Sequence, residues 1–407
     1  MLRHKAVRSF LPSSKTGRSL LSFTLTLLLI EFLDEIVCGA IGAAWPLIRN
    51  DLELSYVEVG LLLAVPHAIG SIAETFLGIV ADSGGRRVLI LGGGVAFVSA
   101  LALTAGSYSF PVLLAAFILF NPASGAFVSL SQASLMDADP ARHTHNMARW
   151  ALAGSLGMVA GPLVLSLSVV LGASWRSVFF ALTLLALLLL RLVWRFSFQT
   201  DSPEDRQMGI AESARNALTA FRRRDVLRWL LLLQFTDLML DVPNGFLALY
   251  FVDAVGVSES KAALAVAVWT GVGLSSDFLI IPLLERVRGL SYLRLSALIV
   301  AFLYPAFLLA PGFSAKIVLV GLLGLMNAGW YSILKAQLYS SMPGRSGAVM
   351  SISSIFEFIG GFIPLALGSL AEHYGLSAIM WLLMAGPIAV LIGIPKNRRQ
   401  QAVSSGP

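Results

Sequence analysis

Long apolar runs separated by short polar stretches make up most of the chain. A transmembrane helix needs about 20 predominantly apolar residues, and on this criterion we predict about twelve spans. They cover residues 19–45, 56–80, 87–107, 110–136, 147–172, 175–195, 226–252, 259–284, 292–311, 315–340, 346–371 and 376–395. The pattern predicts an all-α membrane protein with an N-terminal six-helix bundle (1–196), a cytosolic linker (197–225) and a C-terminal six-helix bundle (226–407).

The composition supports this prediction. Of the 407 residues, 57% are hydrophobic and only 13% are charged, whereas soluble domains are about half apolar and a quarter charged. The net charge of +6 does not indicate nucleic-acid binding, because the basic residues lie between the apolar runs. Cytosolic segments of membrane proteins collect Lys and Arg. We therefore expect the lipid bilayer, and no nucleic acid, as a partner.

The basic residues also predict the orientation. With the N-terminus inside, 24 of the 29 Lys and Arg residues fall in inside segments. Four fall in outside loops: Arg49, Arg176, Lys261 and Lys316. This asymmetry predicts cytosolic N- and C-termini in a plasma (inner) membrane.

Carboxylates interrupt several predicted spans. In the first span, Glu31, Asp34 and Glu35 have i, i+3, i+4 spacing and share one helix face. Each would cost about 2.5–3.5 kcal/mol at the bilayer centre, so we expect a polar cavity, protonation or both. The intramembrane acids are Glu31, Asp34, Glu35, Glu74, Asp237, Asp241, Asp277 and Glu357, against one base, Lys335. Alternatively, several of these acids only form interhelical hydrogen bonds.

The two halves repeat with an offset of 203 residues. LLLIEFLDE (27–35) aligns with LLLLQFTDL (230–238), so that Asp34 meets Asp237; Glu74 likewise meets Asp277. Parallel repeats are a known transporter architecture with the substrate near the midplane. We therefore expect the first and seventh spans to face each other across a negative cavity that favours protons and neutral or cationic solutes. Crowded carboxylates favour protonation of at least one of them, as a coupled set.

The loop between the second and third spans, GIVADSGGRRVLIL (78–91), resembles the signature of the major facilitator superfamily. The matching residues are Gly78, Asp82, Gly85, Arg86 and Arg87, while Ser83 replaces the usual base. The resemblance implies two six-helix bundles that alternate access, with this loop as a conformational latch. Asp82 would face the N-terminus of the eleventh span, and Arg86 would reach Asp137. A plain turn with cytosolic arginines is the alternative.

The fifth span contains GSLGMVAGP (154–162). Its Gly157, Gly161 and Pro162 resemble a signature of drug–proton antiporters in that family, although Leu163 and Val164 replace the glycines that usually follow. A helix-packing surface is the other interpretation. The family's arginine motif in the fourth span is not recognisable. The spacing of DEIVCGAIGAAWPLI and LSYVEVGLL is similar to that of fosmidomycin-resistance exporters.

Other polar or aromatic residues lie within the spans. VPNGF (242–246) predicts a kink or unwound turn in the seventh span. Trp330, followed by Tyr331, is a candidate for stacking on a cationic or aromatic solute, with packing as the alternative. Lys335 is a candidate to neutralise an acid. We interpret His67 as structural, and Cys38 has no second soft ligand nearby, so no metal is expected.

The leading hypothesis is a monomeric secondary transporter that exports a small organic solute in exchange for protons. Proton-coupled uptake and lipid flipping on the same fold remain alternatives. An intramembrane carboxylate enzyme is a different class; the half-chain repeat and the absence of a Gly-x-Gly-Asp pattern argue against it. No phosphate loop, zinc signature or nucleophile elbow occurs in a suitable context, so we expect no cofactor.

Overall fold

The computed structural model describes residues 14–80, 86–138, 143–195, 223–341, 353 and 356–395, and these ranges contain helices and no strands. For a few helical residues, including Glu74, Gly78 and Asp277, the structure describes the helix but not their surroundings. Loop residues Asp82 and Gly85 and most of the predicted linker also lie outside the described residues.

The first half follows the predicted spans closely. Its helices are α1 (Ser14–Leu52), α2 (Tyr56–Val80), α3 (Arg86–Ala105), α4 (Phe110–Ser124), η2 (Gly125–Ser129), α5 (Leu130–Ala138), α6 (His143–Val170) and α7 (Trp175–Val193). The predicted fourth span is thus α4 and α5 joined by a short π-helix, η2, in which the helix takes a wider turn.

The second half is more interrupted. Its helices are α9 (Arg224–Leu240), α10 (Val242–Leu249), η4 (Tyr250–Ala254), α11 (Glu259–Arg286), α12 (Gly289–Leu309), α13 (Phe313–Met326), α14 (Trp330–Ser341), α16 (Ile363–Tyr374), α17 (Leu376–Leu382) and α18 (Ala385–Gly393). The predicted break in the seventh span is confirmed: α9 ends at Leu240, and α10 restarts with Pro243 in its first turn.

A break in the tenth span was not predicted. It separates α13 from α14 at Asn327–Gly329, where Gly329 has a φ of +69°. Only glycine adopts this left-handed conformation without strain. Under the 203-residue offset, this break corresponds to residues 124–126, where η2 begins. The two halves therefore interrupt the same span at the same place.

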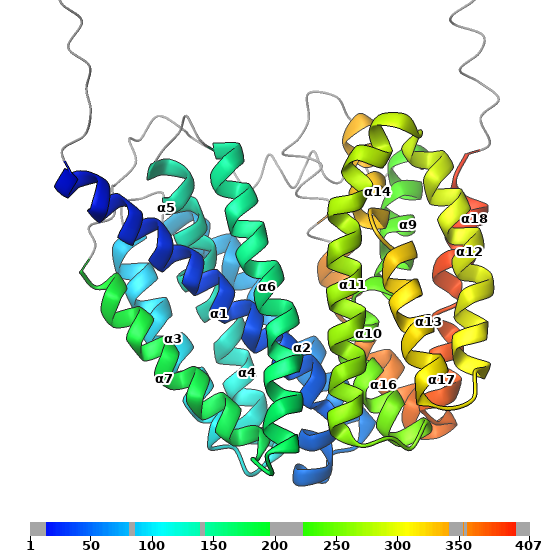
Figure 1. Ribbon diagram of the computed structural model, residues 1–407, viewed down its shortest axis with the longest axis horizontal. Coiled ribbons are helices and arrows are strands. Elements are labelled where there is room, and N and C mark those ends of the chain that lie inside the picture. Colours follow the sequence, from blue (N-terminus) through cyan, green and yellow to red (C-terminus); the bar gives the residue numbers. More distant parts are fainter. Residues whose placement is uncertain are drawn as a thin grey trace, which may run out of the picture.

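The chain folds into two groups of helices, with α1–α7 on the left of Figure 1 and α9–α18 on the right. Helix α1 begins and α18 ends at the same end of the molecule, which we call the terminal end. The opposite end carries the short connections 53–55, 106–109, 171–174, 255–258, 310–312 and 375. The groups meet where α2 packs on α16, α6 on α11, and α1 on α10.

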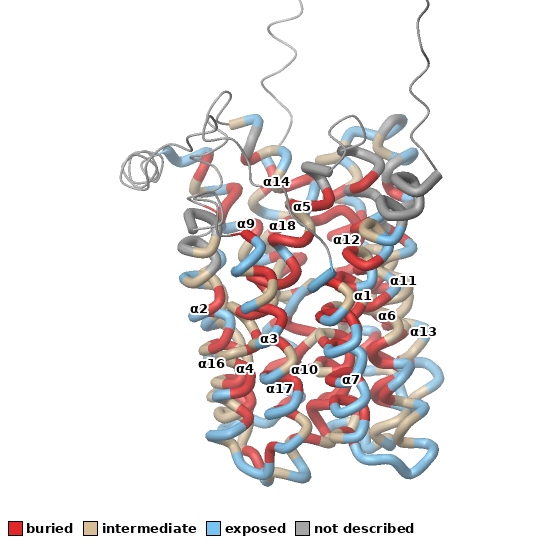
Figure 2. The backbone as a smooth tube through the Cα atoms, turned by 90° about the vertical axis from the view of Figure 1, so that its left-hand side faces the viewer, coloured by how far each residue is buried: buried red, intermediate tan, exposed pale blue. Residues whose placement is uncertain are grey.

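The helices bury one side and expose apolar residues on the other. Within the described ranges, nine helical segments are long and apolar enough to span a membrane. Figure 2 shows exposed positions along the peripheral helices and buried ones between them. The exposed positions include Phe302, which is 74% exposed on α12, and Leu309, which is 72% exposed. Apolar side chains facing outward are expected in lipid and unfavourable in water.

Helices α1 and α6 approach each other closely because α6 presents glycines. A Cβ atom on Gly161 would lie 2.5 Å from the backbone nitrogen of Ala40, and one on Gly157 would lie 2.8 Å from Cβ of Glu35. In the second half, Gly360 lies against the side-chain amide of Gln234 of α9. Gly157 and Gly360 are related by the 203-residue offset, so a glycine faces the first helix of each half at the same repeat position.

Candidate functional site

The acids of the first span lie inside the first half. The hydroxyl of Ser124, at the end of α4, lies 3.0 Å from each carboxylate oxygen of Asp34. Glu31 is buried next to Gly154 of α6, and the side chain of Trp150 hydrogen-bonds it. Asp34 and Glu35 are the electrostatic neighbours of Glu31. These carboxylates therefore form one cluster supported by α4 and α6.

The acids of the seventh span have partners in the second half. Gln234 donates to Asp237 at 3.2 Å. Lys335 of α14 forms an ion pair with Glu357 at 3.1 Å, and both also act electrostatically on Asp237. Lys335 thus neutralises an acid, as the sequence suggested, and that acid is Glu357.

The structure does not bring the two acid clusters together. The charged neighbours of Asp237 all belong to the second half, and those of Glu31 all belong to the first. Among the described intramembrane acids, Asp241 has a titratable neighbour from the other half: His67 of α2 acts on it electrostatically. The structure therefore does not show acids from both halves facing one chamber, and that arrangement stays a prediction.

A two-lobed cavity lies between the halves. The larger lobe, about 380 Å³, is bordered by α1, α2, α4 and α6 of the first half and by α10, α11 and α16 of the second. The smaller lobe, about 320 Å³, extends into the second half toward the break at Asn327–Gly329. Met158, Asn244 and Thr270 border both lobes, so the lobes adjoin.

The larger lobe lies on the pseudo-twofold axis of the repeat. Cys38 and Asp241 are related by the 203-residue offset, as are His67 and Thr270, and all four border this lobe. The pairing places equivalent positions of the first and seventh spans, and of the second and eighth, on opposite walls. A cavity between the first and seventh spans was predicted from the repeat. Most of its lining residues were not, although the repeat offset applied to Cys38 contains the signal.

Among the predicted site residues, Asp241 and Trp330 border the cavity. Trp330 is fully buried, and its indole N–H donates to Ser296 Oγ at 2.9 Å and to the Met326 carbonyl at 3.0 Å. This arrangement supports the packing interpretation of Trp330. The neighbouring Tyr331 is 43% exposed, with the ammonium of Lys335 5.3 Å from its ring centre.

The proposed antiporter-like motif lies at the α1–α6 contact. Gly157 and Gly161 allow backbone approach, and Pro162 lies against Gly39 of α1. The packing interpretation therefore has a direct structural basis.

The predicted latch lies at the terminal end and is only partly described. Arg86 is buried at the start of α3, and Arg87 donates to the carbonyl of Trp194 at the end of α7. Gly78 lies in the last turn of α2, but its surroundings are not described, and Asp82 and Gly85 lie outside the described residues. The latch role stays a prediction.

The opposite end is closed by polar contacts between the halves. Arg49 of α1 forms an ion pair with Asp253 of η4 at 3.1 Å, and the hydroxyl of Tyr56 donates to the same carboxylate at 2.8 Å. The backbone N–H of Tyr56 donates to Glu372 of α16 at 2.9 Å. The Arg49 guanidinium also lies 4.2 Å from the Tyr56 ring centre. We call these four residues the closing network; from the sequence alone, Arg49 is distinguished only as one of four basic residues in outside loops.

No group of three His, Cys, Asp or Glu side chains is placed to hold a metal ion among the residues that the structure describes. The candidate site consists of the cavity between the halves, the two acid clusters and the closing network.

Comparison with known proteins identifies the fold. The sequence pattern of the Major Facilitator Superfamily matches residues 27–365. The fosmidomycin resistance protein of Escherichia coli (strain K12) is 22% identical, over 91% of this chain and 92% of that protein. A bacterial homologue of the human lysosomal transporter Spinster, inward-facing and occupied, has a TM-score of 0.72 at 17% identity and covers 94% of each chain.

A nucleoside transporter, NupG, has a TM-score of 0.72 at 14% identity, over 91% of this chain and 97% of that one. A D-xylose-proton symporter has a TM-score of 0.67 at 15% identity, over 95% of this chain and 99% of that one. These likenesses confirm the fold of two six-helix bundles. Since the family pattern extends over most of the chain, this multi-pass membrane protein belongs to the Major Facilitator Superfamily of transporters.

Proposed function

We propose that this protein exports a small organic solute in exchange for protons, by alternating access through the cavity between its halves. We place it in the plasma membrane with both termini cytosolic, and we retain 1–196, 197–225 and 226–407 as first bundle, linker and second bundle. The observation that carries the proposal is a two-lobed cavity on the repeat axis, beside a closing network that joins the halves at one end.

The acid clusters support the proton component. Asp34 lies next to the Ser124 hydroxyl, and Asp241 borders the cavity opposite His67. A carboxylate held inside the membrane domain is costly, and such residues pair with another group or mark an ion or proton pathway. Proton binding at these acids would change the charge near the cavity and therefore the relative energies of the two access states.

The proposal is tested with purified protein in liposomes of bacterial lipid carrying an imposed pH gradient. Candidate solutes are first screened by their stabilisation of the protein, from cationic drugs, sugars, amino acids, lysolipids and fosmidomycin. A solute that stabilises the protein should then move against its own gradient when protons move the other way. Solute movement in the same direction as protons would establish uptake instead, and release of a chemically altered product without net flux would indicate an enzyme.

Weakening the closing network is expected to favour opening at the end away from the termini. Arg49→Gln combined with Tyr56→Phe removes the ion pair and the phenol hydrogen bond. Together these are worth roughly 1–2 kcal/mol, so the population open at that end should rise about 5- to 30-fold. Cys38, the single cysteine, borders the cavity and reports this as faster labelling by an impermeant maleimide added from that side.

The matched control is Arg176→Gln, which breaks the ion pair between Arg176 and Asp51 within the first half. It should leave Cys38 labelling at the wild-type rate. Equal acceleration by both sets of variants would mean that the closing network has no special part in holding the halves together.

A further inference from the structure

Two buried polar atoms in the cavity walls have no hydrogen-bond partner among the described residues. One is the indole nitrogen of Trp45, a donor from the first half, and the other is Oδ1 of Asn327, an acceptor from the second half. Trp45 is 0% exposed and Asn327 is 4% exposed. Buried polar groups are nearly always hydrogen-bonded, and leaving one unpaired is unfavourable. Both atoms therefore need a partner from outside the described chain.

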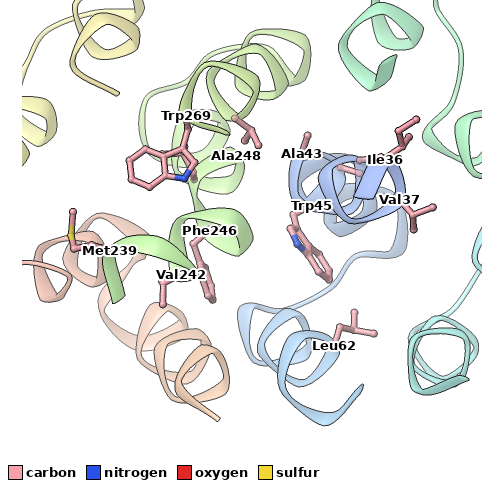
Figure 3. Packing of buried hydrophobic residues seen from close by; sticks show 14 of the residues in the cluster. Ile36, Val37, Ala43, Trp45, Leu62, Met239, Val242, Phe246, Ala248 and Trp269 are labelled. Carbon is pink, nitrogen blue, oxygen red and sulfur yellow. The ribbon is translucent and has the colours of Figure 1, made fainter. Parts of the chain in front are cut away.

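Packing fixes the direction of the Trp45 N–H. The indole lies between Leu62 of α2 and Phe246 of α10, and its nitrogen is on the side of the second half (Figure 3). Phe117 meets the ring edge-on, with 6.1 Å between ring centres. Trp45, Leu62, Phe117 and Phe246 all border the larger lobe. The donor is thus held in an apolar, largely aromatic wall at the boundary between the halves.

Asn327 lies at the break of the tenth span and borders the smaller lobe. Its Nδ2 donates to the Met239 carbonyl at 3.4 Å, which orients the amide. The repeat-related residue in the first half is Ser124, whose hydroxyl bonds Asp34. Among the described contacts, Asn327 forms no equivalent hydrogen bond with Asp237. Its acceptor is left for another partner.

The charge of the walls restricts that partner. Among the described residues bordering the two lobes, Asp241 is the only carboxylate, and no Lys or Arg is present. The basic side chain bordering the lobes, His67, already acts electrostatically on Asp241. An anion would therefore have to leave water for a cavity that contains a carboxylate and offers it no Lys or Arg, which is strongly unfavourable.

We propose that the cavity selects a compact, largely apolar solute without negative charge, which accepts a hydrogen bond from Trp45 Nε1 and donates one to Asn327 Oδ1. This inference rests on the proposed transport function and names its substrate class. Because donor and acceptor belong to different halves, a solute that bonds both joins the two bundles. Both atoms lie behind the cavity surface in the described structure, so a solute can bond them only if the walls repack. Solute binding is thereby coupled to conformational change.

The test uses matched aromatic probes on the full chain in lipid nanodiscs, with affinities measured by calorimetric titration. Methyl 2-naphthoate offers an acceptor, 2-naphthol offers a donor, and 2-naphthoate is the anion of the same ring. Trp45→Phe should weaken the ester about three- to tenfold, the effect of one lost hydrogen bond, and spare the naphthol. Asn327→Leu should weaken the naphthol by a similar factor and spare the ester. The anion should bind the wild type more weakly than the ester.

The control is Trp175→Phe, the same substitution at an indole that already donates to Asp51 outside the cavity; it should bind all three probes like the wild type. Equal losses for both probes in either cavity variant would overturn the proposal. It would also be overturned by unchanged affinities, by anion binding as tight as that of the ester, or by no binding of the neutral probes. Because binding is measured without transport, a failure here leaves the proton-exchange proposal standing, and a failure of transport leaves this result intact.

Discussion

Replacing Asp34 with asparagine is expected to abolish pH-driven solute movement while leaving membrane insertion intact. The amide cannot gain or lose a proton in the working pH range, so the first cluster loses its central exchangeable site. The asparagine oxygen still accepts from Ser124, whose hydroxyl lies 3.0 Å from the Asp34 carboxylate, so stability should change by no more than about 1 kcal/mol. The measurement is solute flux into or out of liposomes under an imposed pH gradient.

Ser124→Ala is the matched control, because it removes the neighbouring hydroxyl and keeps the titrating carboxylate. It should retain coupled flux, because Asp34 keeps its carboxylate and loses only one hydrogen-bond donor. Normal coupled flux in Asp34→Asn would remove Asp34 from the proton pathway. Loss of solute binding as well as of coupling would assign Asp34 to the solute site instead.

Placing a methyl group on Gly161 is expected to damage the fold severely. In Gly161→Ala the new Cβ would meet the carbonyl oxygen of Ile36 and lie 2.5 Å from the Ala40 nitrogen. Backbone atoms cannot rotate away as a side chain would, so α1 and α6 must separate. Overpacking typically costs about 1–3 kcal/mol, and we expect a loss at or above the top of that range. Thermal unfolding of the purified protein and the yield of folded protein measure it.

Gly92→Ala is the control for helix propensity. Gly92 lies inside α3, and nothing would approach its new Cβ within 4 Å. Alanine is favoured over glycine in a helix interior by roughly 0.5–1 kcal/mol, so this variant should be as stable as the wild type or more so. If Gly161→Ala unfolded no earlier than Gly92→Ala, the close contact of α1 with α6 would not exist as described.

Most of the fold followed from one-dimensional patterns. Apolar run length placed the spans, and the 203-residue offset related the halves, because both are properties of contiguous sequence. The break at VPNGF was readable because proline cannot continue a helix in the ordinary way. The break at Asn327–Gly329 was missed because a lone glycine in an apolar run is equally consistent with helix packing.

The candidate site was less accessible to sequence reasoning. Asp34 and Asp237 were singled out by their charge, yet they have partners within their own halves. The cavity walls are formed by residues such as Trp45 and Phe246, whose types are ordinary in apolar spans. Their importance depends on which helix faces meet across the boundary, and this is set by packing between segments some 200 residues apart in the sequence.

The central claim is that the two bundles rock about the cavity, so that one end opens as the other closes. Spin-label distance measurements in nanodiscs test it, with cysteines introduced in a Cys38→Ser background. One label pair, at Leu171 and Tyr374, spans the halves at the end away from the termini, and a second pair, at Trp194 and Arg288, spans them at the terminal end; these side chains are exposed. The account predicts two distance populations for each pair, and Arg49→Gln should lengthen the first distance while it shortens the second. A single unchanged distance at both ends, or lengthening at both ends together, would contradict it.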